Sequence, residues 1–69
     1  MEFVKVLFPT ERDVFIDGQI SGKTNKVLAV GLGHHTFTLA GTNYTPTHIA
    51  DIVSNTSSEF PMIIKFGQV

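Results

Sequence analysis

Three histidines, His34, His35 and His48, are the side chains of this sequence best suited to catalysis or metal binding. Imidazole titrates near neutral pH and is a common ligand for zinc. His34 and His35 are adjacent, so on an extended strand their rings point to opposite faces and do not chelate one ion together. His48 joins one of them only if its own strand pairs alongside, and the sequence has no cysteine to complete a site. We therefore expect no metal ion and no other cofactor.

A nucleophilic or phosphate-binding site is also not indicated. A hydrolytic site needs a nucleophile, a histidine and a carboxylate that converge in a pocket. The serines stand only at positions 21, 54, 57 and 58, in segments of loop-like composition with no nucleophile-elbow sequence around them. Gly22-Lys23-Thr24 resembles the end of a phosphate-binding loop, but Asp17 replaces the required first Gly, and no helix pattern follows. We predict that the protein is not an enzyme.

Length and charge restrict the partners. The 69 residues form one domain, 1–69, near the lower size limit for independent folding, and there is no cysteine to add a disulfide. Stability must come from a well-packed β core or from association with another copy or another domain. The net charge of −1 comes from dispersed residues without a basic stripe, which argues against nucleic acid.

Nothing in the sequence indicates membrane insertion or export. No apolar run approaches the ~20 residues that cross a bilayer, and the N-terminus lacks the pattern of a signal peptide. A chain complete as written is expected in the cytoplasm. A domain cut from a longer exported protein would instead belong to the cell envelope or the extracellular space.

The segment 14–22 is the strongest local structural signal. Asp17-Gly18 stands between apolar residues, and this pair is typical of a type I′ turn, which needs positive φ at both central positions. We predict a strand over 13–16 whose core face carries Val14 and Ile16, followed by the turn, a short return, and a polar loop over 21–25.

Further strands follow from the alternation of apolar residues. In segment 2–8, Val4, Val6 and Phe8 share the predicted core face. The other predicted strands cover 26–32 (core face Leu28, Val30 and Leu32), 34–40 (His35, Phe37 and Leu39), 44–53 and 60–66 (Met62, Ile64 and Phe66). For residues 47–53 a short helix remains an alternative, because Ile49, Ile52 and Val53 also have helical spacing. Six or seven short strands separated by turns predict a small all-β domain, an antiparallel sandwich or a small barrel.

Two aromatic residues are candidates for an interaction surface. Phe15 alternates with Val14 and Ile16, and Phe3 alternates with Val4, so one face of each strand carries a ring outside the predicted core. Either these rings are covered by the core or a loop, or they form an exposed apolar patch used for association. The sequence leaves both interpretations open.

The order of several short motifs resembles the PEGA domain family. The matching residues are Val14-Phe15-Ile16-Asp17-Gly18, Gly22-Lys23-Thr24, Gly33-His34-His35-Thr36-Phe37, and Asn43-Tyr44 with Pro46. The segment that would carry the Pro-Glu-Gly-Ala-like run reads Ala29-Val30-Gly31-Leu32, and Asn43 replaces the usual Gly. The resemblance implies a small all-β module, often appended to bacterial and archaeal envelope or surface-layer-like proteins, without established catalytic residues.

The expected function is therefore that of a non-catalytic binding or structural module that makes protein–protein or surface contacts. A carbohydrate-binding module is the first alternative, with Tyr44, Asn43 and His35 as its candidate cluster. The second alternative is a small standalone regulator, of phage origin, that inhibits a host protein. Self-association is a further hypothesis for the same surfaces.

Overall fold

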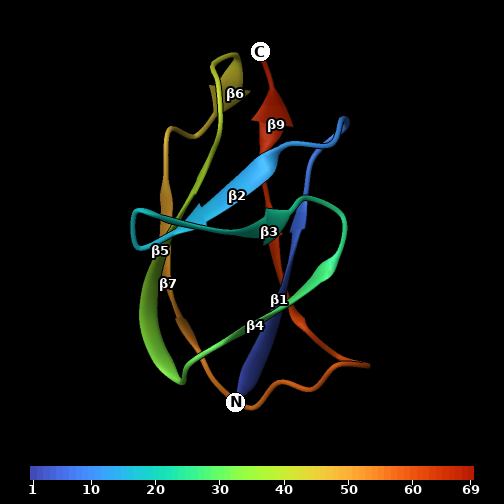
Figure 1. The fold of residues 1–69 in the computed structure, drawn as a ribbon, viewed down its shortest axis with the longest axis vertical. Coiled ribbons are helices and arrows are strands. Elements are labelled where there is room, and N and C mark those ends of the chain that lie inside the picture. The colour runs from blue at the N-terminus through green and yellow to red at the C-terminus, as the bar shows by residue number, and fades with distance from the viewer.

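All regular elements in the computed structural model, which describes residues 1–69, are β-strands (Figure 1). They are β1 (Glu2–Leu7), β2 (Asp13–Ile16), β3 (Gln19–Lys23), β4 (Val27–Val30), β5 (Gly33–Leu39), β6 (Tyr44–Thr45), β7 (Ile49–Val53), β8 (Met62–Lys65) and β9 (Gly67–Gln68). The predicted all-β class is confirmed. The structure contains no helix with the length and apolar character needed to span a membrane.

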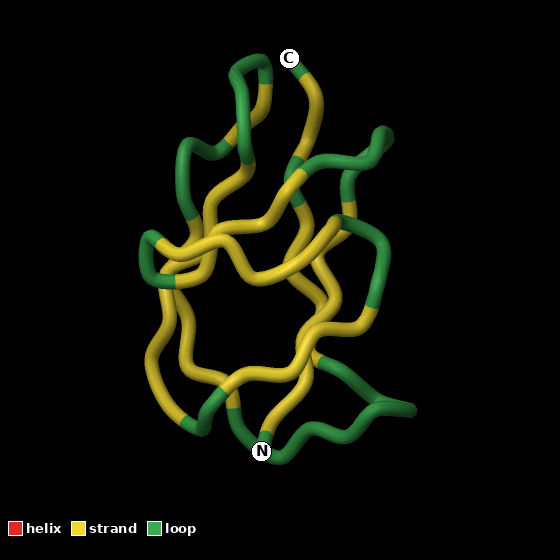
Figure 2. The backbone as a smooth tube through the Cα atoms, in the orientation of Figure 1, coloured by secondary structure: helices red, strands yellow, loops and turns green.

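The strands form two main sheets and a short ribbon. Sheet A has the order β4-β1-β8, sheet B has the order β3-β2-β5-β7, and β6 pairs with β9. The β6–β9 ribbon lies at the end of the molecule that carries the C-terminus, opposite the N-terminus (Figure 2). Pairing is antiparallel throughout except between β1 and β8, which run parallel. The count of nine exceeds the predicted six or seven because β6 and β9 have only two residues each and β3 is a full strand.

The core lies between the two sheets. Eleven buried apolar side chains form one cluster: Val4, Val6, Phe8, Val14, Ile16, Val30, Phe37, Leu39, Val53, Ile64 and Phe66. Strict alternation places them inside, since successive side chains of a strand point to opposite faces. The predicted core faces of segments 2–8 and 13–16 are therefore confirmed.

The Asp17-Gly18 turn is also confirmed. Asp17 and Gly18 have φ values of 54° and 81°, as a type I′ turn requires, and Ile16 pairs with Gln19 across it. The predicted loop over 21–25 is partly wrong, because β3 continues to Lys23. A bulge opposite Val14 and Phe15 absorbs the register shift, so the return strand stays paired.

Three predicted strands have other boundaries than expected. The prediction that Leu32 lies on the core face is wrong: Leu32 is 72% exposed, because β4 ends at Val30 and the chain then turns from sheet A into sheet B. Segment 44–53 divides into β6 and β7 around Pro46, which has no N–H for a ladder, and it contains no helix. The last long strand starts at Met62 rather than Phe60, after Pro61, for the same reason.

Candidate interaction surface

Asp17 and His35 connect the β2–β3 turn to β5. The Asp17 carboxylate lies 2.6 Å from Nδ1 of His35 and accepts the backbone N–H of Thr36 at 2.9 Å. The backbone N–H of Asp17 in turn donates to the Thr36 carbonyl. The second ring nitrogen of His35, Nε2, lies 2.8 Å from the carbonyl oxygen of Gly31. Two segments that the sequence singled out therefore meet in space, and their contact is structural.

The geometry favours the charged form of His35. An ionised carboxylate and a carbonyl accept hydrogen bonds but cannot donate them, so both ring nitrogens carry hydrogen when both bonds form. The hydrogen bond to Asp17, followed by that to Gly31, raises the pKa of His35. The Thr36 N–H, followed by His35, lowers the pKa of Asp17. The pair is an ion pair whose His35 side chain is only 16% exposed.

Stability is expected to depend on pH through this pair. A raised pKa for His35 means that its contribution is complete below the unfolded value of about 6.5 and is lost as pH rises through the folded value. A lowered pKa for Asp17 means that its contribution is present above about 3.9 and is lost as pH falls through the folded value. Urea unfolding should therefore give a higher midpoint at pH 5.5 than at pH 8.

A substitution isolates this effect. His35→Gln should remove the difference between the midpoints at pH 5.5 and pH 8. His48→Gln should keep it, because the His48 ring lies 3.4 Å from the Thr47 hydroxyl and has no carboxylate partner among the ion pairs. An unchanged difference in the His35 variant would contradict the assignment.

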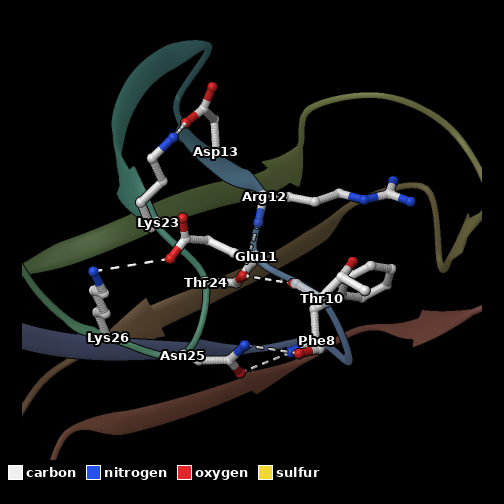
Figure 3. A network of polar contacts seen from close by, with 9 residues as sticks. All are labelled: Phe8, Thr10, Glu11, Arg12, Asp13, Lys23, Thr24, Asn25 and Lys26. Carbon is white, nitrogen blue, oxygen red and sulfur yellow. Dashed lines mark hydrogen bonds and ion pairs between the residues drawn. The ribbon is translucent and has the colours of Figure 1, made fainter.

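The Gly22-Lys23-Thr24 segment forms a structural corner rather than a phosphate loop (Figure 3). The Thr24 hydroxyl accepts the Arg12 N–H at 3.0 Å and donates to the Thr10 carbonyl at 2.9 Å. The Asn25 side chain bonds both the N–H and the C=O of Phe8, and Asn25 itself has φ 64°. These contacts join the loop after β1 to the turn after β3.

Charged side chains of the same corner are also engaged. Lys23 pairs with Asp13, and Lys26 lies 3.9 Å from Glu11. The Arg12 guanidinium donates to the carbonyls of Ala40 and Thr42 and lies over the Phe8 ring. The corner therefore has its lysines and its arginine already partnered.

The structure separates the two phenylalanines of the candidate surface. Both are half-buried and point away from the core, because their neighbours Val4, Val14 and Ile16 point into it. Phe3 lies on the outer face of sheet A, and Phe15 lies on the outer face of sheet B between Ile20 and Thr38. They do not form one patch.

The residues of the candidate carbohydrate cluster are not brought together. Asn43 and Tyr44 lie at the β6–β9 ribbon, where Tyr44 pairs with Gln68 and packs edge-on against Phe66 at 5.4 Å. Asn43 has φ 66° and turns the chain into β6. The His35 ring lies against the Asp17 turn instead, within hydrogen-bonding distance of Gly31 (see above).

The outer face of sheet A brings together residues that lie far apart in the sequence. Lys5 of β1 lies directly opposite Val27 of β4 and Ile63 of β8, so one row crosses all three strands. Val27 and Ile63 are exposed apolar side chains. We call this surface the A face; it consists of Phe3, Lys5, Leu7, Val27, Ala29, Ile63 and Lys65.

Alternation within segment 2–8 predicted which side chains of β1 point outward, but not which neighbours they would have. The register between β1 and β8 joins residues about 58 positions apart, such as Lys5 and Ile63. Nothing in the local pattern determines such a pairing.

Enclosed sites and groups of metal-binding side chains are the other kinds of site that the geometry could provide. The structure has no pocket, and no group of three or more His, Asp or Glu side chains is placed to hold a metal ion.

No family model matches the chain, and no curated protein and no solved structure matches it.

Proposed function

We propose that this chain is a non-catalytic β-sandwich module, similar to PEGA domains, that binds another protein through the A face. The observation that carries the proposal is the composition of that face. Five of its seven residues are apolar, and Val27 and Ile63 are 43% and 52% exposed. Apolar side chains that adjoin one another on a sheet surface are typical of contact sites between proteins.

A sheet face without a pocket favours a macromolecular partner. Small ligands are usually enclosed by pockets, whereas protein contacts use broad, nearly flat areas. Ordered motifs such as Ile16-Asp17-Gly18 and Gly33-His34-His35 support the PEGA-like assignment, and in this fold they serve as turn and connection. A framework role for these residues fits a module whose binding surface lies elsewhere.

Paired substitutions on the two sheets test the proposal. Val27→Thr with Ile63→Thr removes apolar area from the A face, and Ile20→Thr with Ile52→Thr removes it from exposed positions of sheet B. Each exposed substitution should change the free energy of unfolding by only about 0.5 kcal/mol or less. The full chain, immobilised, would be exposed to an extract of the cells that produce it, and the bound proteins quantified.

We expect that a protein retained by the sheet B variant binds the A-face variant at least about tenfold more weakly, a difference of about 1.4 kcal/mol in binding free energy. Equal retention by both variants would contradict the proposal. Glycan-array binding that survives the A-face substitutions would favour the carbohydrate alternative. A concentration-dependent dimer in sedimentation, lost with the A-face substitutions, would replace the foreign partner with a second copy.

A further inference from the structure

The strand β8 is an edge of sheet A with one unpaired side. It pairs with β1 alone, so the other row of its backbone N–H and C=O groups has no strand partner. Such an edge is a template for an additional strand. Ile63 and Lys65 of β8 belong to the A face, so a strand added here would also extend that face.

Two other edge strands of the main sheets, β7 and β3, carry features that disfavour pairing. In β7, the Ile52 N–H donates to the Asp51 carboxylate at 2.8 Å, which occupies a backbone donor. In β3, a bulge interrupts the register with β2, and the Ser21 hydroxyl donates to the Gln19 carbonyl. Bulges and local side-chain bonds of this kind protect natural sheet edges.

The β4 strand adjoins the other sheet through one side chain. A Cβ placed on Gly22 of β3 would meet a methyl group of Leu28 in β4, so the Leu28 side chain lies against the backbone of β3. The two sheets are thus in contact on this side of the sandwich. Among the four edge strands of the two main sheets, β4 and β8 have neither a bulge nor an internal side-chain bond, and of these two β4 carries the contact between Leu28 and Gly22.

The charge of the A face indicates which kind of strand could add to the edge of β8. Lys5 and Lys65 form no ion pair, in contrast to Lys23 and Lys26, and the face contains no carboxylate. Lys5 is half-buried between Val27 and Ile63. A partner that places carboxylates here would neutralise both charges.

A second copy of this strand is the less suitable occupant. Two β8 strands joined edge to edge would bring the lysines of both A faces onto one continuous surface, and like charges across paired strands repel. An edge lysine is a common feature that prevents self-association of sheets. The same lysine attracts an acidic strand.

From these observations we infer that the partner of the proposed binding function supplies an extended segment of alternating apolar and acidic residues, which adds to the free edge of β8. Its acidic side chains lie on the A-face side, beside Lys65. Its apolar side chains lie on the opposite side, beside half-buried Met62 and buried Ile64. Main-chain hydrogen bonds provide the attachment, and the alternating side chains provide the selectivity.

Three synthetic peptides test this inference on the full isotope-labelled chain. The first is a capped nine-residue peptide that alternates Val and Glu. The second replaces every Glu by Lys. The third keeps the acidic sequence but carries N-methyl groups on alternate residues, which removes N–H donors needed for strand pairing. Binding is measured by amide chemical-shift changes at low and at moderate salt.

We expect the acidic peptide to shift the amides of β8 and β1 and to bind less tightly as salt increases. The basic and the N-methylated peptides should bind at least about tenfold more weakly, or about 1.4 kcal/mol. Lys5→Glu with Lys65→Glu should reverse the preference so that the basic peptide binds better. The control variant Lys23→Glu with Lys26→Glu has the same net charge as the A-face variant, but its substitutions lie outside the A face. It should still bind the acidic peptide more tightly than the basic one.

Other outcomes overturn the inference in different ways. Equal binding of the N-methylated peptide would indicate docking without strand addition, and shifts confined to β3 or β7 would place the site on another edge. Binding of vesicles of anionic phospholipid to the A face, without binding of the acidic peptide, would indicate a lipid surface. If no peptide binds but the cellular partner still depends on Val27 and Ile63, the strand-addition inference fails and the proposed function stands.

Discussion

Phe37→Ala is expected to lower the free energy of unfolding by about 3–5 kcal/mol. Phe37 is fully buried in the centre of sheet B, where it lies opposite Ile16 and Ile49 in the neighbouring strands. Removal of its ring loses the transfer free energy of a large apolar group and leaves a cavity that the surrounding strands fill only in part. Small domains have only about 5–15 kcal/mol in total, so this substitution removes a large share.

Urea unfolding followed by circular dichroism measures this loss. Phe37→Leu keeps most of the apolar volume and should cost less than half as much. Phe60→Ala removes the same ring from a side chain that is 78% exposed, and should change stability by only about 0.5 kcal/mol or less. A Phe37→Ala variant that unfolds at the wild-type midpoint would contradict the assignment of this ring to the core.

Thr24→Val is expected to have the second largest effect, a loss of about 1–3 kcal/mol. Thr24 is the one buried polar residue, with 1% exposure, and its hydroxyl bonds both Arg12 and Thr10. Valine has nearly the same shape but neither donates nor accepts. The Arg12 N–H and the Thr10 carbonyl would each lose a partner in a partly buried position, where an unsatisfied polar group is costly.

Thr24→Ser is the matched control, because it keeps the hydroxyl and loses only a methyl group. It should retain more stability than Thr24→Val in the same denaturation experiment. Amide exchange of Arg12 should also accelerate in the valine variant, since its N–H would lack an acceptor. Equal stability of the serine and valine variants would show that the hydroxyl bonds do not contribute.

The local features of the fold could be predicted from the amino-acid pattern. The positive-φ turn at Asp17-Gly18 depends on two residues, and the inward positions of Val4, Val6 and Phe8 depend on alternation within one strand. Both effects act over a few neighbouring residues and are therefore visible in the pattern. The strand boundaries at Pro46 and Pro61 were harder to predict. Proline is tolerated in an edge strand but not at a paired position, and the sequence does not show which of the two a proline occupies.

The neighbours of each strand could be known only from the folded structure. It joined Asp17 to His35, separated Phe3 from Phe15, and placed Lys5 between Val27 and Ile63. These arrangements depend on strand order and register, including the parallel pairing of β1 with β8. Pairing between distant strands is selected by how the complete core packs, and no short stretch of sequence contains that information.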